Sequence, residues 1–269
     1  MSESDSMAPQ KADAIIEQRG HTLILTLNRP EARNALSTEM LSIMVDAWDR
    51  VDDDPDIRCC ILTGAGGYFC GGGDLNWVLS QNRDLVVSSH AGRSSRRIQN
   101  SILDLEKPII AKVRGPAIGL GCSLALYCDF VYATPDATFA DPHVSVGLVA
   151  GDGGTILWPQ LIGYARARRY LLTGDPIKGA EAAEIGLITE AVPGEELDEV
   201  VAHMASRLLS GAKYAIKWTK SSINAALKLT ANAVIDRAGA FENLTQMTND
   251  NRVAAEAFLA KEKPKFTRD

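Results

Sequence analysis

Two glycine-rich turns are the segments of this sequence best suited to chemistry. The first runs from Gly64 to Gly73 and the second from Gly115 to Gly121, and each follows a short apolar stretch and leads toward a predicted helix. Glycine lets the backbone approach a ligand closely, and the first N–H groups of a helix have no partner within that helix. Two such turns can direct two N–H donors at one oxygen, which is the geometry of an oxyanion hole. Tight turns that bind no ligand are the alternative interpretation.

Several other cofactor motifs do not fit. A dinucleotide-binding turn needs G-x-G-x-x-G, and here Gly119 and Gly121 are followed by Leu124 where the third glycine belongs. The sequence has no Gly-Lys-Ser/Thr of a nucleotide-binding loop, no H-E-x-x-H, no C-x-x-C and no G-x-S-x-G nucleophile elbow. We therefore expect no metal site and no dinucleotide.

Alternating strands and helices must position the two turns. The apolar pattern predicts a hairpin from strands at 14–18 and 22–27, and Ser37 is a suitable N-cap for an amphipathic helix ending near Asp53. The rest of the first half predicts strands at 59–63, 109–113 and 130–133, and helices around 98–105 and 120–127. After about residue 150 helices dominate, at 155–161, 165–173, 178–185, 197–209, 212–227, 234–248 and 252–261, with one strand at 187–192. This order predicts an α/β core with a helical C-terminal part.

Composition restricts the class of protein further. The 269 residues are 46% hydrophobic, which is enough for a full core, and the net charge of −6 argues against a general nucleic-acid binder. We expect no signal peptide, no membrane span and a disordered tail over residues 1–13. The five cysteines form no C-x-x-C pair, so we expect reduced thiols in a cytoplasmic protein.

Ordered motifs along nearly the whole chain, from about residue 14 to 266, carry a family resemblance. They include Leu27 to Leu36, Phe69 to Asp74, Lys107 to Cys122, Val146 to Leu148 and Ala183 to Leu187. On these motifs the sequence resembles the crotonase superfamily, also called the enoyl-CoA hydratase/isomerase family. The resemblance implies an α/β spiral of ββα units over residues 14–205 and a helical trimerisation region over 206–269. It also implies an acyl-CoA thioester as ligand, with CoA carried by the substrate rather than held as a cofactor, and a homotrimer or a hexamer of two trimers.

The resemblance also assigns site residues. The oxyanion N–H groups would come from Gly73 and from Leu120, where the family usually has glycine; the backbone N–H survives that change. The path of the adenine and pantetheine would be lined by Ala32, Arg33, Gly71, Gly72, Asp74 and Leu75. Lys261 and Phe266 would approach the CoA of a neighbouring subunit.

The departure from the family pattern concerns the acid–base groups. Hydratases of this family use two glutamates, and the corresponding positions here are Ser123 and His143, so the standard hydratase mechanism does not transfer. His143 could be a general base or simply a hydrogen-bonded histidine. Asp152 could help His143 or cap the helix that follows it, and Asp141 could orient His143 or close a turn before Pro142. Ser123 could hold a water but is a poor base alone.

Three functional hypotheses follow from these residues. The first is an enzyme that hydrates an enoyl-CoA or shifts its double bond, with His143 as the main proton-transfer residue and Asp152 as its helper. The second is an acyl-CoA binding protein without catalysis. The third is a thioester hydrolase, or another reaction of this family, that uses a His/Asp pair.

Overall fold

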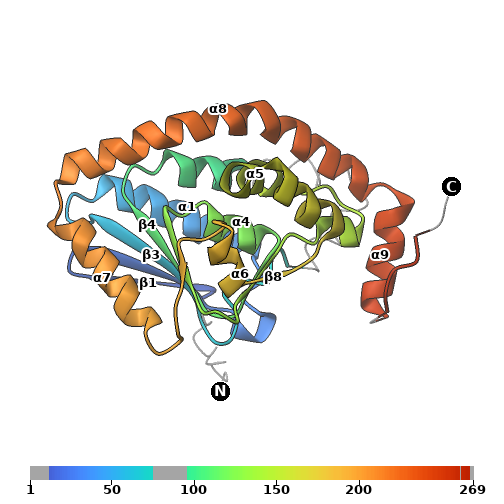
Figure 1. Ribbon diagram of the computed structural model, residues 1–269, viewed down its shortest axis with the longest axis horizontal. Helices are drawn as coiled ribbons and strands as arrows, with labels where there is room; N and C mark the ends of the chain where they lie inside the picture. Colours follow the sequence, from blue (N-terminus) through green and yellow to red (C-terminus); the bar gives the residue numbers. More distant parts are fainter. Residues whose placement is uncertain (1–11, 75–95, 261, 267–269) are drawn as a thin grey trace, which may run out of the picture.

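The computed structural model describes residues 12–74, 96–260 and 262–266. Within these ranges the chain forms two β-sheets and a set of helices that pack against them (Figure 1). The six-stranded sheet has the order β1-β2-β3-β4-β6-β9, with only the β1–β2 pair antiparallel. Its strands are β1 (Ala14–Arg19), β2 (Thr22–Leu27), β3 (Cys59–Gly64), β4 (Ile109–Val113), β6 (Phe130–Ala133) and β9 (Glu190–Ala191). The predicted hairpin is confirmed.

A second, smaller sheet was not predicted, because its strands have three residues or fewer. It contains β5 (Pro116–Ile118), β7 (Thr138–Ala140) and β8 (Ile177–Lys178), in the order β5-β7-β8. The β5–β7 pair is parallel, so the residues that follow these two strands lie at the same edge of the sheet. This small sheet positions the site described below.

The helices follow the strands in a repeated order. Helix α1 (Thr38–Asp53) begins after β2, a helix over 96–104 follows β3, α4 (Leu120–Leu126) follows β5, and α5 (Gly154–Thr173) follows β7. In each unit a strand joins the large sheet, the next segment forms either a strand of the small sheet or an isolated bridge, and a helix closes the unit. The bridges are Leu36–Gly73 and Cys70–Ala117. The predicted spiral of ββα units is therefore confirmed.

The N-terminal and central helix predictions agree closely with the structure. Ser37 is the N-cap of α1, and its side chain accepts a hydrogen bond from the Met40 N–H at 3.1 Å. The two helices predicted between 155 and 173 form one element that Gly163 interrupts, with φ of 76°. A left-handed φ is accessible to glycine at little cost, so the chain kinks there.

The C-terminal helices are longer and fewer than predicted. Helix α6 (Gly179–Glu184) and α7 (Leu197–Ser210) match, but the predicted helices 212–227 and 234–248 are one helix, α8 (Lys213–Gln246), of 34 residues. The break was wrong because residues 228–233 contain no glycine or proline, and nothing else in them stops a helix. Helix α9 (Asn249–Leu259) completes the fold, and the expected boundary at 205/206 falls inside α7. Of the strand predicted at 187–192, only β9 forms.

Helix α8 runs across the molecule above α4 and α5 (Figure 1). An ion pair ties it to the segment before β6, with Nζ of the buried Lys220 2.7 Å from Asp129 Oδ2, and the same ammonium donates to the Lys107 carbonyl at 2.8 Å. Helix α7 covers the large sheet through Leu197, Val201 and neighbouring apolar residues. No helix in the described ranges is long and apolar enough to cross a bilayer.

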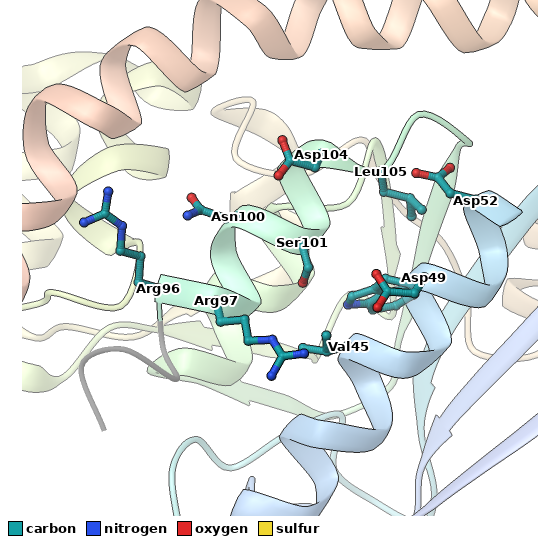
Figure 2. A pocket seen from close by; sticks show the side chains of 10 residues that line it. Val45, Asp49, Asp52, Arg96, Arg97, Asn100, Ser101, Asp104 and Leu105 are labelled. Atoms are coloured by element: carbon teal, nitrogen blue, oxygen red, sulfur yellow. The ribbon is translucent and has the colours of Figure 1, made fainter. Parts of the chain in front are cut away.

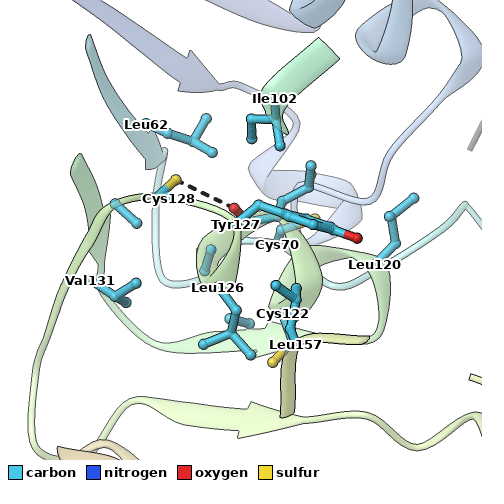
Figure 3. Packing of buried hydrophobic residues seen from close by; sticks show 14 of the residues in the cluster. Leu62, Cys70, Ile102, Leu120, Cys122, Leu126, Tyr127, Cys128, Val131 and Leu157 are labelled. Atoms are coloured by element: carbon cyan, nitrogen blue, oxygen red, sulfur yellow. Dashed lines mark hydrogen bonds between the residues drawn. The ribbon is translucent and has the colours of Figure 1, made fainter. Parts of the chain in front are cut away.

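The five cysteines are free and buried. Cys70, Cys122 and Cys128 pack among leucine, isoleucine and tyrosine side chains between the sheets and α4 (Figure 3). Burial raises the pKa of Cys59 and of Cys70 to about 12, which keeps these thiols protonated and unreactive near neutral pH. The predicted free thiols are confirmed, and they serve as small apolar core residues.

Candidate active site

The two glycine-rich turns pack directly against each other. The Ile118 N–H donates to the Cys70 carbonyl at 2.9 Å, and a Cβ at Gly121 would lie 2.6 Å from the Cys70 Cβ. Only glycine permits this approach, because real Cβ contacts are longer. Gly73 and Leu120 therefore lie on adjacent backbone segments. Neither of their N–H groups donates a hydrogen bond to another residue in the described part of the chain.

His143 lies beside the second turn because the small sheet places it there. The Gly119 N–H donates to the Ala140 carbonyl at 2.9 Å, which joins the end of β5 to the end of β7. His143 follows β7 by three residues, and its Cε1 lies 3.6 Å from where a Cβ on Gly119 would stand. The imidazole is thus next to the turn that carries the Leu120 N–H.

Asp152 reaches the same place from the turn that precedes α5. Gly153 has φ of 127° and packs against α4 so closely that a Cβ would lie 3.2 Å from the Ser123 Cβ. This contact brings Asp152 to Ser123, whose Oγ donates to Asp152 Oδ1 at 3.1 Å. The N-cap of α5 is Gly153, while the Gly154 N–H donates to the Asp152 carboxylate. The Asp152 carboxylate therefore interacts with the first turn of α5 and also faces His143.

Four side chains form a continuous line in the interior. His143 Nδ1 lies 2.5 Å from Asp141 Oδ1, and His143 Nε2 lies 3.3 Å from Asp152 Oδ2. The aspartates are 1% and 6% exposed at their side chains and the histidine 13%, so the contacts are shielded from solvent. The order Asp141–His143–Asp152–Ser123 brings together three residues that sequence analysis proposed for catalysis, with Asp141 in the orienting position.

The pKa values of His143 and Asp152 are both raised in this line, but for different reasons. Burial lowers the pKa of His143, but the carboxylates of Asp152 and Asp141 act more strongly together and raise it well above its usual value. His143 is therefore an imidazolium at neutral pH, with both nitrogens directed at carboxylates. Burial raises the pKa of Asp152 to about 6, although the positive His143 opposes that change. Asp152 is consequently the group in the line that gains or loses a proton near neutral pH.

Sequence analysis missed a third acid at this site, Glu242 of α8. Burial raises the pKa of Glu242 to about 7, and the charges on His143, Asp152 and Asp141 all act on it. The sequence held one weak signal, because Glu242 is the single acidic residue between 238 and 249, in a segment with Ala238, Gly239 and Ala240. Nothing in the spacing connected it to a turn some 90 residues earlier.

The residues proposed for CoA binding lie around the first turn. Arg29 holds Asp74 through an Nη1–Oδ2 contact of 3.1 Å, and the Arg33 guanidinium lies 5.6 Å from the ring centroid of Tyr68. The Gly71 N–H donates to the Arg33 carbonyl at 2.9 Å, so the backbone after Ala32 packs against the glycines. Leu75 and Lys261 lie outside the described residues.

Phe266 is described and is 46% exposed. Its expected approach to a neighbouring subunit stays a prediction, as does the contact of the other CoA-path residues with ligand.

A metal could find ligands in the same line, since Asp141, His143 and Asp152 bring one ligand atom each within 4.8 Å of one another. In this geometry these atoms are directed at each other. A separate groove of about 510 Å³ lies between α1 and the helix over 96–104 (Figure 2). It is lined by Val45, Asp49, Asp52, Arg96 and Arg97 among others, and it contains none of the candidate site residues.

The sequence and the fold match one protein family. The family model for enoyl-CoA hydratase/isomerase covers residues 17–269. Enoyl-CoA hydratase EchA19 of Mycobacterium tuberculosis is 40% identical over 94% of this chain and 96% of its own length. Crotonyl-CoA hydratase of Syntrophomonas wolfei is 36% identical over 94% and 96%. The crystal structure of an enoyl-CoA hydratase/isomerase from Mycobacterium paratuberculosis superposes with a TM-score of 0.87 at 33% identity, over 93% of this chain and 99% of that one.

These matches define a class of acyl-CoA-processing enzymes. The chain belongs to the enoyl-CoA hydratase/isomerase family, and it is an enzyme of the lyase or isomerase class.

Proposed function

We propose that this protein adds water to an enoyl-CoA thioester, or shifts its double bond, through an enolate held by the N–H groups of Gly73 and Leu120. The observation that carries the proposal is the buried line Asp141–His143–Asp152–Ser123 beside two adjacent N–H groups that donate to no described residue. An N–H pair directed at the thioester oxygen stabilises the negative charge that develops there when the α-carbon gains or loses a proton. The names of the relatives support the same substrate class.

Asp152 is the group we propose for direct proton transfer. Both His143 nitrogens face carboxylates, so the imidazolium cannot accept a proton from substrate, and its charge instead keeps Asp152 ionised above a pKa of about 6. This distribution exchanges the roles expected from sequence: His143 positions and charges the site, and Asp152 transfers the proton. Ser123 donates to Asp152 Oδ1, which leaves Asp152 Oδ2 between His143 and the substrate.

The third hypothesis, a thioester hydrolase that uses a His/Asp pair, is not favoured by this geometry, because both His143 nitrogens face carboxylates and the protonated imidazole cannot accept a proton from water. Ser123 is not available to activate a water as a base either, because its hydroxyl donates to Asp152. An acyl-CoA binding protein without catalysis remains the second candidate from sequence, and no contact in the site favours it.

The proposal is tested by incubating the purified protein with a panel of enoyl-CoA thioesters of increasing chain length. Products are detected by mass spectrometry, and binding is measured by calorimetry on the same panel. We expect a mass increase of one water for hydration, or an unchanged mass with a new chromatographic position for a double-bond shift. Tight binding without any product would refute the enzyme and select the binding protein.

The proposal extends to the oligomeric state and the cellular compartment. We propose a homotrimer or a hexamer of two trimers, supported by large apolar side chains exposed on α8, namely Tyr214, Trp218, Ile223, Leu229, Phe241 and Leu244. Light scattering that found only a 29.0 kDa species at micromolar concentration would refute it. We further propose that CoA enters with the substrate, that no separate cofactor is held, and that the five free thiols reflect a reducing, cytoplasmic setting.

A further inference from the structure

Glu242 lies against the catalytic turn although it comes from a distant helix. A Cβ on Gly151 would collide with Glu242 Oε2 and would lie 3.0 Å from the Ala238 carbonyl. Gly151 directly precedes Asp152, so the glutamate carboxyl packs on the peptide that carries the proposed proton-transfer group. Glycine at 151 is what allows this approach, because any side chain there would displace the carboxyl.

Further contacts hold α8 and α9 in place over this segment. Thr245 Oγ1 accepts a hydrogen bond from the Val149 N–H at 3.2 Å, and Asn251 Nδ2 donates to the Val146 carbonyl at 2.8 Å. Thr245 lies three residues after Glu242, and residues at that spacing share one face of a helix. The Glu242 side chain therefore stands on the face of α8 that is fixed to the 146–151 segment, and it is partly buried there.

Among the residues that the structure describes, His143 is the one cation whose charge acts on Glu242. The nitrogens of His143 are already held by Asp141 and Asp152. Three carboxyl groups thus share one imidazolium in a buried space. One of the three is then favoured to keep a proton, since the negative charges repel each other. Asp141 and Asp152 contact the imidazolium directly whereas Glu242 does not, and burial raises the pKa of Glu242, so we assign the proton to Glu242.

We infer that Glu242 is the second proton-transfer residue of this enzyme, acting with Asp152 on the two carbons of the enoyl-CoA double bond. The inference rests on the proposed function and extends it, because addition of water requires both a base and an acid, whereas a double-bond shift can use one group.

The step balances without any further reactant. A water O–H bond breaks, its proton passes to Asp152, and its hydroxyl bonds to the β-carbon. The O–H bond of protonated Glu242 breaks, and its proton bonds to the α-carbon as the enolate collapses. The proton on Asp152 then returns to Glu242, and the net change is one water added.

The test compares Glu242→Gln with Asp236→Asn in the full-length protein, using the enoyl-CoA that the parent converts fastest. Asp236 is a matched control, because it is an exposed acid on the same helix that pairs with Arg96 at the surface. We expect Glu242→Gln to lower kcat for hydration by about 10²–10⁴ with KM changed only a few-fold. We also expect it to remove the alkaline limb of the kcat profile near pH 7, while Asp236→Asn changes neither.

A second variant, Glu242→Asp, keeps a titratable carboxyl and guards against a folding defect in the glutamine variant. We expect it to recover part of kcat and to move the alkaline limb rather than remove it. Full kcat with an unchanged pH profile in Glu242→Gln, or an unmoved limb in Glu242→Asp, would overturn the role of Glu242 and leave the proposed function intact. A parent that converts no enoyl-CoA would overturn both.

Discussion

Replacement of Glu242 by glutamine should make the folded protein more stable at alkaline pH, even as it lowers activity. In the folded chain burial raises the pKa of Glu242 from 4.5 to about 7. Each pH unit of difference between folded and unfolded pKa is worth about 1.4 kcal/mol, so ionised Glu242 costs the folded state about 3 kcal/mol above pH 7.

The sign of the pH dependence follows from which state holds the proton. Below pH 4.5 the carboxyl is neutral in both states and costs nothing. Between 4.5 and about 7 the unfolded chain releases the proton while the folded chain keeps it, so the free energy of unfolding falls as pH rises. A glutamine side chain does not ionise, so position 242 does not lower the free energy of unfolding of the variant as the pH rises.

The assay is urea unfolding of parent, Glu242→Gln and Asp236→Asn at one protein concentration, at pH 5 and pH 8.5. We expect the advantage of Glu242→Gln over the parent to grow by about 2–3 kcal/mol between these two pH values. Asp236→Asn should show no such growth, since it removes only a surface ion pair, which is worth about 0–1 kcal/mol. A pH-independent difference, or a glutamine variant that weakens at pH 8.5, would show that Glu242 is ionised and well paired in the folded protein and would refute the reasoning.

Three further substitutions test the rest of the site. Gly73→Pro removes one proposed oxyanion donor and should lower kcat by about 10²–10³; full activity in a variant with native circular dichroism would exclude Gly73 from the hole. His143→Ala removes the positive neighbour of Asp152, so kcat should fall by about 10²–10⁴ and the acidic limb of the pH profile should move to higher pH, an effect absent if the two side chains act separately. Gly154→Ala places a Cβ against Asp141 Oδ2 and should cost about 1–3 kcal/mol of stability along with activity. Gly239→Ala on α8 meets open space and should cost neither, so equal effects of the two alanines in unfolding and rate measurements would contradict the packing argument.

The sequence by itself determined the local structure and the family. Ser37 and the apolar spacing after it were sufficient to place α1, because an N-cap and an amphipathic face act within a few residues. The two glycine-rich turns could be recognised from their glycine content, because a close approach of two backbone segments requires glycine at the point of contact. Ordered motifs along the chain then indicated the family and its spiral.

Only the tertiary structure decided how the chemistry is distributed. His143 was expected as the base, and its charge became clear only when Asp141 and Asp152 were found on both of its nitrogens. Glu242 was invisible to local patterns, because α8 brings it to Gly151 across about 90 residues of chain. The physical reason is that a pKa depends on burial and on neighbouring charges, and both are set by which distant segments pack together. Propensity and spacing describe a residue's neighbours in the chain, whereas proton affinity depends on its neighbours in space.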